Sequence, residues 1–310
     1  MSAVLMDGKA LSLKIRESVK TRAAILKEKG ITPCLAVVLV GEDPASLSYV
    51  KSKGKALAEA GMEGLDIRLD GSTSEEELLS LIDGLNRNDK VHGILVQSPL
   101  PGHINEEKIN DAVAVHKDVD CFHPVSVGNM VLGRQGFLPC TPHGILMLLR
   151  EYNVPVDGAH AVIIGRSNIA GKPLANLLIR RNYNTTVTIC HTGTKNLSAH
   201  TLQADILIAA AGSPFLIKPE MVKNGAAVID IGINRVSDNS APKGYRVCGD
   251  VDPAVEKKAG FFTPVPGGVG PMTIAMLLNN VIDAAQQNAC GTAKAVCTAK
   301  AVCVKSEEVE

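Results

Sequence analysis

The chain has no tryptophan, few aromatic residues and no surplus of either charge. Aromatic residues make up 3% of its 310 residues, too few for a platform on which nucleic-acid bases stack. Lysine and arginine number 32, as do aspartate and glutamate, so no excess of positive charge favours nucleic acid or an anionic membrane surface. We therefore expect neither class of partner.

Long apolar runs and paired cysteines are also missing. The longest apolar runs, at 35–40 and 206–211, are far shorter than the roughly 20 residues that a membrane-spanning helix needs. Residues 1–22 lack the apolar core of a signal peptide. None of the eight cysteines forms a Cys-x-x-Cys pair, so we expect no metal site and no disulfide framework. Reduced thiols favour a cytoplasmic location.

What is present is a regular alternation of short apolar runs and amphipathic stretches. With 45% hydrophobic residues the chain can bury a sizeable core, and its length predicts about two domains. The pattern predicts helices at 9–29, 43–60, 74–86, 171–181 and 270–287. It predicts strands at 34–40, 66–69, 91–97, 160–165, 185–190, 205–210 and 226–231. Apolar strands alternating with helices imply parallel sheets that are covered on both faces, an α/β fold.

Three segments depart from this alternation or mark a helix start. Ser74, followed by Glu77, has the spacing of a capping box. Residues 98–145 are rich in proline, glycine and histidine, and we predict loops that carry function. The tail repeats Thr-Ala-Lys-Ala-Val-Cys at 292–297 and 298–303. A six-residue repeat does not keep one helical face, so we predict a weakly ordered appendage over 289–310.

The strongest local signal is a glycine turn between an apolar strand and a helix, at 161–173. Gly165 permits a tight turn, Ser167 stands where a dinucleotide fingerprint has its second glycine, and the helix amino terminus can hold a pyrophosphate. An ordinary strand-to-helix turn remains the alternative. The next strand ends without the carboxylate that holds an NAD ribose, whereas Arg166 and Lys195 can attract a 2′-phosphate. The sequence therefore predicts NADP.

Tyr49 and Lys53 stand four residues apart on one helix and share a face. Taken alone, they fit a solvated basic face equally well. The same Tyr-x-x-x-Lys spacing occurs in short-chain dehydrogenases, but there the pair follows the glycine turn, and here it precedes it. Gln97 ends a buried strand, where parallel sheets form their ligand crevice, although a loop amide is an equally good interpretation.

Two further segments supply candidate ligand groups. Asp118 and Asp120 are either surface charges or acceptors for a pterin-like ring with adjacent N–H donors. His123 and His143 flank prolines, and we interpret both as structural hydrogen-bonding groups. The segment 263–273 packs proline and glycine into a stiff loop that leads into the last helix, which indicates a tight turn or, more sharply, a ligand pocket lined by backbone.

Together these segments resemble the bifunctional methylenetetrahydrofolate dehydrogenase/methenyltetrahydrofolate cyclohydrolase family. The resemblance runs from about residue 4 to about residue 288. It is carried by the motifs at 49–53, 93–101, 117–124, 139–142, 165–173 and 264–273. Several long motifs in the family's order are far more specific than any one of them.

The resemblance implies two reactions in one cleft: NADP-dependent oxidation of 5,10-methylenetetrahydrofolate to the methenyl form, then hydrolysis to 10-formyltetrahydrofolate. It implies that Lys53 is the catalytic group of hydrolysis, that Gln97 orients it, that Tyr49 lies against the folate and that Asp120 holds the pterin. The implied folate site comprises Tyr49, Lys53, Val96, Gln97, Ser98, Asp120, Pro266, Gly267, Gly268 and Val269. The implied NADP site comprises Gly165, Arg166, Ser167, Thr192 and Ile233.

The fold that the resemblance implies has two α/β lobes around a cleft. One, at 1–145 with helix 270–288, would bind folate on a parallel sheet, and the other, at 146–269, would be a Rossmann-like NADP lobe. The family is commonly homodimeric through the cofactor lobe. The methenyl bridge is cationic, so a protonated lysine nearby would oppose its formation. Burial and positive neighbours lower the pKa of a lysine, and we expect Lys53 to act as a neutral base.

Two positions depart from the family's pattern, and two other functions compete with this one. Cys121 stands where the family has glycine, and Ser98 where it has leucine, so the pocket beside Asp120 and Gln97 differs. A shikimate dehydrogenase relative also pairs a small lobe with a Rossmann lobe, but it does not account for Tyr49, Lys53 and Gln97 together. A non-catalytic NADP-binding module has no need of an intact Lys53.

Overall fold

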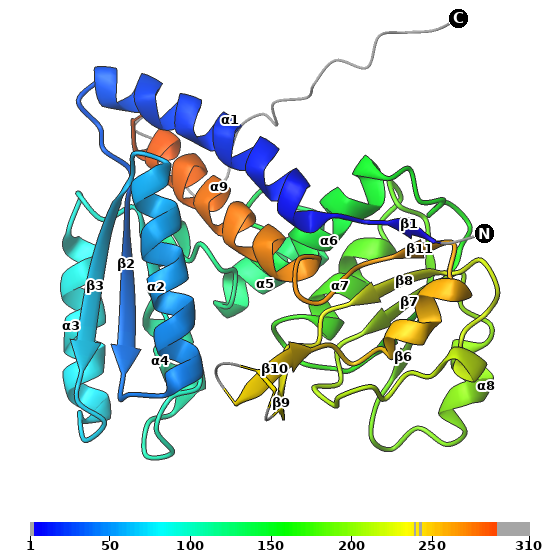
Figure 1. The fold of residues 1–310 in the computed structure, drawn as a ribbon. Helices are drawn as coiled ribbons and strands as arrows, with labels where there is room; N and C mark the ends of the chain where they lie inside the picture. Colours follow the sequence, from blue (N-terminus) through cyan, green and yellow to red (C-terminus); the bar gives the residue numbers. More distant parts are fainter. Residues whose placement is uncertain (1–2, 239, 242–243, 290–310) are drawn as a thin grey trace, which may run out of the picture.

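Two parallel sheets, one in each of two α/β lobes, organise the chain (Figure 1). The computed structural model describes residues 3–238, 240–241 and 244–289. The first lobe has the strand order β3-β2-β4, with β2 at Cys34–Val40, β3 at Glu63–Leu69 and β4 at Gly93–Val96. Its helices are α2 (Pro44–Glu59), α3 (Glu75–Arg87) and α4 (Glu106–Ala112), with a 3-10 turn at Val115–Lys117. Helix α5 (Pro124–Val131) follows and packs against α7 (Gly171–Leu178) of the second lobe.

The second lobe has six parallel strands in the order β1-β11-β8-β7-β5-β6. They are β1 (Val4–Leu5), β5 (His160–Ile164), β6 (Thr186–Cys190), β7 (Ile206–Ala209), β8 (Ala227–Asp230) and β11 (Phe261–Phe262). Helices α7 (Gly171–Leu178) and α8 (Leu197–Thr201) and 3-10 turns at Pro219–Met221 and Pro253–Lys257 accompany them. An antiparallel hairpin, β9 (Asn234–Ser237) with β10 (Tyr245–Cys248), extends from this lobe toward the first (Figure 1).

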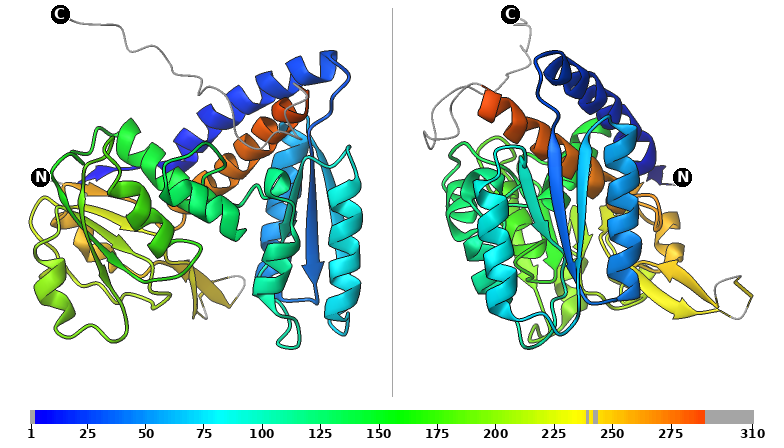
Figure 2. Two further views of the ribbon diagram at one scale, coloured as in Figure 1. Left: turned by 180° about the vertical axis from the view of Figure 1, so that it is seen from behind. Right: turned by 90° about the vertical axis from the view of Figure 1, so that its left-hand side faces the viewer.

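Alternate side chains of the central strands enter different apolar clusters, as the pleat of a strand requires. On β2, Leu35, Val37 and Leu39 face a cluster that includes α2, while Ala36 and Val38 face one that includes α3 and α4. Figure 2 shows α2 and the α3–α4 pair on opposite faces of this sheet. The central strand β5 likewise contributes to two clusters. Both sheets are therefore covered on both faces, which explains their continuous apolar strands.

Three helices join the lobes: α1 (Gly8–Glu28), α6 (Cys140–Glu151) and α9 (Val269–Ala289). Helices α1 and α9 follow β1 and β11, which are adjacent parallel strands, and both run from the second lobe over the first (Figure 1). Their side chains belong to the same apolar cluster as those of β2 and β5. One core therefore continues from one lobe into the other.

The α/β fold class with its parallel sheets is confirmed, and so is the capping box. The Ser74 hydroxyl accepts from Glu77 N at 3.2 Å, and the Glu77 carboxylate accepts from Ser74 N at 2.9 Å. The prediction of loops throughout 98–145 is wrong, because α4, α5 and the first half of α6 lie there. Their starts carry local caps at Asn105 and His123 rather than a long apolar periodicity. The hairpin β9–β10 was not predicted, and the repeat at 292–303 lies outside the described residues.

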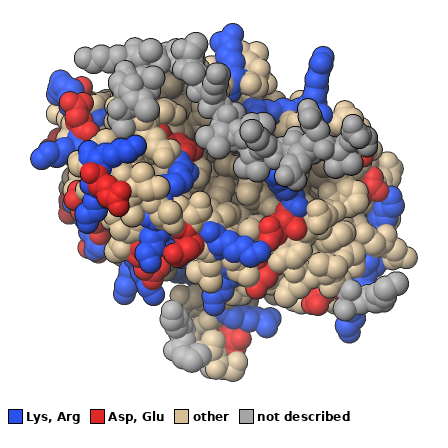
Figure 3. Space-filling view, turned by 90° about the horizontal axis from the view of Figure 1, so that it is seen from above, with Lys and Arg blue, Asp and Glu red and all other residues tan. Residues whose placement is uncertain are grey.

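Surface charge, helix hydropathy and clusters of metal-binding side chains bear on the possible partners. Seen from above, the molecule shows lysine and arginine interspersed with aspartate and glutamate rather than gathered into one broad patch (Figure 3). None of the helices in the described ranges is long and apolar enough to cross a membrane. Within those ranges, no group of three or more histidine, cysteine, aspartate or glutamate side chains is placed to hold a metal ion.

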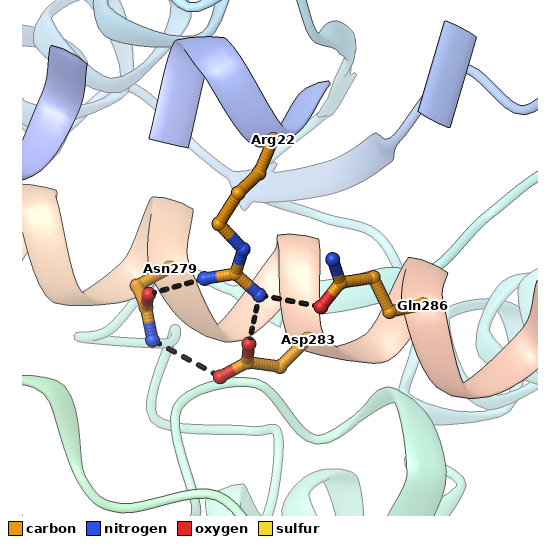
Figure 4. Close-up of polar contacts among 4 residues, drawn as sticks. All are labelled: Arg22, Asn279, Asp283 and Gln286. Carbon is orange, nitrogen blue, oxygen red and sulfur yellow. Dashed lines mark hydrogen bonds and ion pairs between the residues drawn. The ribbon is translucent and has the colours of Figure 1, made fainter. Parts of the chain in front are cut away.

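One polar cluster ties α1 to α9 (Figure 4). The Arg22 guanidinium of α1 donates to Asn279 Oδ1 at 2.9 Å, to Gln286 Oε1 at 2.6 Å and to the Asp283 carboxylate. Asn279 Nδ2 also donates to Asp283 Oδ2 at 3.0 Å. Burial raises the pKa of Asp283, and Arg22 opposes that rise. Arg22 therefore compensates a carboxylate that lies partly out of water.

Replacing Arg22 with alanine removes the three guanidinium hydrogen bonds and leaves the Asp283 carboxylate without its cation, with only Asn279 Nδ2 still donating to it. We expect Arg22→Ala to lower the free energy of unfolding by about 1–2 kcal/mol, measured by urea denaturation. The control is Lys14→Ala on the same helix, whose ion pair with Glu151 is exposed to solvent and should contribute much less to stability. Equal losses for the two variants would contradict this account.

Candidate active site

Lys53 and Gln97 meet between α2 and the end of β4. Asp43 caps α2 by accepting from Ser46 N at 2.7 Å, and Gln97 follows the last residue of β4. Lys53 Nζ donates to Gln97 Oε1 at 2.9 Å. Gln97 Nε2 donates to the Ser98 carbonyl at 2.7 Å, so both ends of the amide are engaged and its orientation is set. The amide oxygen is thus held toward the amine.

Burial lowers the pKa of Lys53 from its ordinary value of 10.5. Two neighbours act in the opposite direction, Asp120 first and Cys140 second. The expectation of positive neighbours is therefore not met, because the charged groups that act on Lys53 are acidic. Desolvation has the larger effect, and it makes a neutral amine available at a lower pH than for a lysine in water.

The structure separates the two aspartates that the sequence left equivalent. The buried Asp118 carboxylate accepts from Phe122 N and His123 N, both at 3.0 Å, and so closes the turn after it. Asp120 is partly exposed. Burial raises the pKa of the Cys140 thiol well above its ordinary value, and Asp120 adds to this through its charge and a hydrogen bond. Asp120 therefore acts on both Cys140 and Lys53, whereas the Asp118 carboxylate closes the turn.

The two departures from the family's pattern lie beside these groups. Cys121 has φ +61°, in the left-handed region that glycine occupies without cost, and its side chain is buried. The turn is nonetheless closed, with Cys121 N donating to Asp118 O at 3.1 Å. Ser98 Oγ donates to Glu106 at the start of α4 at 2.5 Å. Neither substitution interrupts the contact between Lys53 and Gln97.

The two histidines of this region differ. His123 Nδ1 accepts from Val125 N at 3.0 Å and caps α5, which confirms its structural role. His143 Nδ1, on α6, is buried and has no hydrogen-bond partner among the described residues. Burial lowers the pKa of His143 to about 4, so the ring is neutral at pH 7. The prediction of a hydrogen-bonding role is wrong for that nitrogen of His143.

Tyr49 lies one helical turn before Lys53, on the same face of α2. Its side chain is 37% exposed, and burial of the rest raises the pKa of its phenol. Arg235 of β9 acts on it in the opposite direction, so the hairpin of the second lobe faces α2 of the first. Arg235 was not predicted as a site residue, because the weak polar–apolar alternation of residues 234–237 was the only indication of a strand there.

The proline- and glycine-rich loop is fixed by the start of α1. Lys9 N donates to Gly267 O at 2.8 Å, and Gly267 itself has φ +115°. A Cβ on Gly8 would lie 1.8 Å from Gly268 O, so the helix can approach the loop only through a glycine. Gly268 and Val269 are buried, whereas Pro266 is exposed and Gly267 is partly exposed, so Pro266 and Gly267 are the part of the loop that a ligand can reach.

The turn after β5 has the dimensions of a phosphate-binding loop. Gly165 has φ +121°, and a Cβ there would lie 2.1 Å from Ala210 O. A Cβ on Gly171 would lie 2.1 Å from Gly165 O, so α7 starts directly against the turn. Arg166 and Ser167 are exposed at this edge. The cradle therefore fits a pyrophosphate at a helix amino terminus.

Two more residues of the predicted NADP site, Ile233 and Thr192, are exposed, and Ile233 also contacts another element. Ile233 is exposed, and a Cβ on Gly270 would lie 3.8 Å from its Cδ1, so it abuts the start of α9. Thr192 is exposed beyond β6. Two surface cavities, of about 520 and 430 Å³, lie elsewhere: one between α2 and β3, the other at the amino-terminal edge of the second sheet. Neither contains Lys53 or Gln97.

Together, a dinucleotide-type turn in one lobe and an amine–amide pair in the other define a two-domain α/β enzyme of the nucleotide-dependent class. Residues 6–120 match the model of the tetrahydrofolate dehydrogenase/cyclohydrolase catalytic domain, and residues 139–289 match the NAD(P)-binding domain of the same family. The chain belongs to the tetrahydrofolate dehydrogenase/cyclohydrolase family.

Individual relatives agree. A protein of Campylobacter hominis named bifunctional protein FolD is 54% identical over 283 residues, covering 91% of this chain and 97% of the relative. The crystal structure of a FolD methylenetetrahydrofolate dehydrogenase/cyclohydrolase from Campylobacter jejuni is 51% identical, with a TM-score of 0.88, over 93% of this chain and all of that one. The Trypanosoma brucei enzyme, complexed with NADP and an inhibitor, is 37% identical, with a TM-score of 0.89, over 93% and 99% of the two chains.

These findings confirm the predicted family, its two activities and NADP as cofactor. They decide against the two competing functions, a shikimate dehydrogenase relative and a non-catalytic module. Family membership also excludes the short-chain interpretation of Tyr49 and Lys53. The roles of individual residues rest on geometry and are argued below.

Gly165→Ala tests the phosphate turn. The added methyl group would collide with the Ala210 carbonyl, and alanine would be strained at this φ, so the turn must shift. We expect the dissociation constant for NADP, measured by equilibrium titration, to rise at least about tenfold. Gly84→Ala in α3, where a Cβ meets nothing within 4 Å, serves as the control. It should leave that constant unchanged and stabilise the protein by about 0.5–1 kcal/mol.

Proposed function

We propose that Lys53 is the general base of the hydrolytic step in an enzyme that oxidises 5,10-methylenetetrahydrofolate with NADP and then hydrolyses the product to 10-formyltetrahydrofolate. The observation that carries the assignment is the 2.9 Å hydrogen bond from Lys53 Nζ to Gln97 Oε1 in a desolvated setting. The pair stands at the carboxyl end of a parallel strand, where α/β folds bind their ligands.

The reaction sequence requires an amine that is neutral for part of the cycle. Removal of a hydride from the one-carbon bridge leaves a cationic methenyl carbon, and a nearby ammonium would repel that charge. The neutral Lys53 amine, favoured by burial, takes a proton from the attacking water. The hydroxyl adds to the bridge carbon and gives a neutral tetrahedral adduct. The bond from that carbon to N5 then breaks as the proton held by Lys53 passes to N5, and the added hydroxyl loses its own proton to solvent as its oxygen becomes the formyl carbonyl, so one proton is released overall.

The neighbours of Lys53 have complementary roles. Gln97 accepts from the amine and so directs its lone pair and stabilises the ammonium once the proton has been taken. Asp120 offers a carboxylate to the N–H donors of a pterin ring, and Tyr49 offers a half-exposed ring on which the folate can lie. Loop 264–269 contributes the exposed Pro266 and the partly exposed Gly267.

The NADP site in this proposal comprises Gly165, Arg166, Ser167, Thr192 and Ile233. The tight turn at Gly165 supports the pyrophosphate contact, and the exposed Arg166 supports a contact with the 2′-phosphate. When bound, NADP accepts the hydride. Ile233 abuts the start of α9, which supports placing the nicotinamide end near the first lobe.

The domain division and the molecular context are part of the same proposal. We assign folate binding to residues 1–145 with helix 270–288, and NADP binding to 146–269.

A homodimer through the second lobe is supported by the free edge of β6 and by exposed Ile179 and Ile189 beside it. A cytoplasmic location is supported by five buried, unpaired cysteines among the described residues. The balanced charge supports function without nucleic acid.

Replacing Lys53 with methionine keeps the aliphatic length of the side chain and removes the base. We expect Lys53→Met to abolish ring opening, so that methenyltetrahydrofolate persists. The measurement is the near-ultraviolet absorbance of the methenyl form in neutral solution, compared with an acidified sample in which that form is preserved.

The matched control for this variant is Lys51→Met, an exposed lysine two residues away on the same helix. It should hydrolyse the methenyl compound at the rate of the unmodified enzyme. Full hydrolysis by Lys53→Met would refute the assignment of the base. Equal loss of hydrolysis in both variants would show that the helix, rather than the Lys53 amine, is being disturbed.

The pH dependence of hydrolysis tests the role of Gln97. The neutral amine is the active form, so the rate falls as the pH drops through the pKa of Lys53, which lies below 10.5. Gln97→Leu removes an acceptor that favours the ammonium, so the inflection moves to lower pH while kcat falls. The enzymatic rate is measured after subtraction of the uncatalysed rate. Ser52→Ala, at an exposed hydroxyl of α2, should leave the inflection in place; an unmoved inflection in Gln97→Leu would contradict the coupling.

A further inference from the structure

Two carboxylates are buried at the carboxyl-terminal edge of the second sheet, and the reaction described above does not use them. Asp230 ends β8 and is 2% exposed, and Asp250, just beyond β10, is completely buried. Main-chain N–H groups, rather than cations, occupy their oxygens. Burying two like charges together is costly, so the bonds that they make indicate what the arrangement is for.

Asp250 gathers two separate segments of the chain. Its Oδ2 accepts from Ala211 N at 2.6 Å and from Gly212 N at 2.9 Å. Its Oδ1 accepts from Ser213 N at 2.9 Å and from Asn234 Nδ2 at 2.8 Å. One side chain therefore fixes the loop after β7 and the first residue of the β9–β10 hairpin.

Asp230 completes the arrangement from the other side. Its carboxylate accepts from Gly232 N at 2.9 Å, Asp250 N at 3.0 Å and Val251 N at 2.9 Å. Burial raises the pKa of Asp230 to about 6 against these bonds. A Cβ on Gly232 would lie 2.4 Å from Asp250 Oδ1, and one on Gly249 would lie 1.8 Å from Asp230 Oδ2. Asp250 thus occupies the space beside Gly232, two residues after Asp230, and Asp230 occupies the space beside Gly249, which directly precedes Asp250.

The segments held in this way face the edge where the cofactor is proposed to bind. Ile233 lies between Gly232 and Asn234, which are bonded to Asp230 and Asp250 respectively, and its side chain reaches the start of α9 near Gly270. The loop 211–213 directly follows Ala210, whose carbonyl abuts the phosphate turn. Both segments continue strands whose carboxyl ends form the ligand crevice of such folds.

We propose that Asp250 is a positioning residue for NADP: it sets the backbone of loop 211–213 and the orientation of Ile233 on the nicotinamide side of the site. The inference rests on the proposed placement of the cofactor. The proposal assigns a function in cofactor affinity to two sequence segments, 230–234 and 249–250. This function is separate from catalysis at Lys53.

The experiment is Asp250→Asn in the full chain. The amide keeps one acceptor oxygen and turns an NH₂ group toward main-chain donors, so at least one pair of bonds is lost. We expect the dissociation constant and KM for NADP to rise about tenfold, and kcat at saturating NADP to change less than about threefold. Hydrolysis of methenyltetrahydrofolate without NADP should stay within about twofold of the unmodified enzyme.

The matched control is Asp252→Asn, two residues further on. Asp252 accepts from Ala254 N and pairs with Lys218 at the surface, away from the bonds described above. It should leave the affinity for NADP unchanged. If Asp250→Asn does not fold, Asn234→Ala removes only one of the four bonds to Asp250, and the dissociation constant should then rise about threefold.

The outcomes separate this inference from the proposed function. Unchanged NADP affinity in folded Asp250→Asn, or in Asn234→Ala when the first variant fails to fold, overturns it. Equal loss of oxidation and of cofactor-free hydrolysis in Asp250→Asn also overturns it, because that result indicates a general structural role. Absence of NADP binding by the unmodified enzyme would instead contradict the proposed function.

Discussion

The packing of α1 against α9 is the interaction on which the arrangement of the two lobes depends. The two helices follow adjacent parallel strands of the second sheet and together cover the first lobe. A single apolar core therefore continues from the second lobe into the first. Gly8 lets α1 start directly against loop 264–269, and Arg22 compensates Asp283 further along. The loop that is proposed to line the folate site is therefore positioned by the same contact that joins the lobes.

The parts of the fold that the sequence predicts are those where periodicity is long or strands are buried on both faces. Continuous apolar runs such as 34–40 and 160–165 correspond closely to β2 and β5, and the 21-residue α1 was predicted within a residue at each end. Helices α4 and α5 were missed because seven or eight residues do not establish a helical period. The hairpin at 234–248 was missed because its strands are short and half exposed.

The site shows the same limit at the level of single residues. Because Gln97 follows a buried parallel strand, it was predicted to lie at the carboxyl edge of the sheet, where ligands bind. The spacing of four residues predicted that Tyr49 and Lys53 share one face of a helix. Residue type and spacing alone did not distinguish Asp118 from Asp120, and only the family resemblance singled out Asp120, because the difference is which carboxylate the following turn buries. Asp250 gave no signal of its own, since its partners are backbone N–H groups 37 to 39 residues away and the Asn234 side chain 16 residues away along the chain.

The chain passes between the lobes three times, through α1, through α6 and through α9. Two lobes that are joined by a single linker can open about one hinge, whereas three helices packed against one another resist such a hinge motion. Changes in the separation of the lobes must then take the form of small shears in which these helices slide together as one block. With folate and NADP on different lobes, as proposed, stiffness of this kind would keep the distance between the donor carbon and its acceptor nearly constant through repeated turnovers.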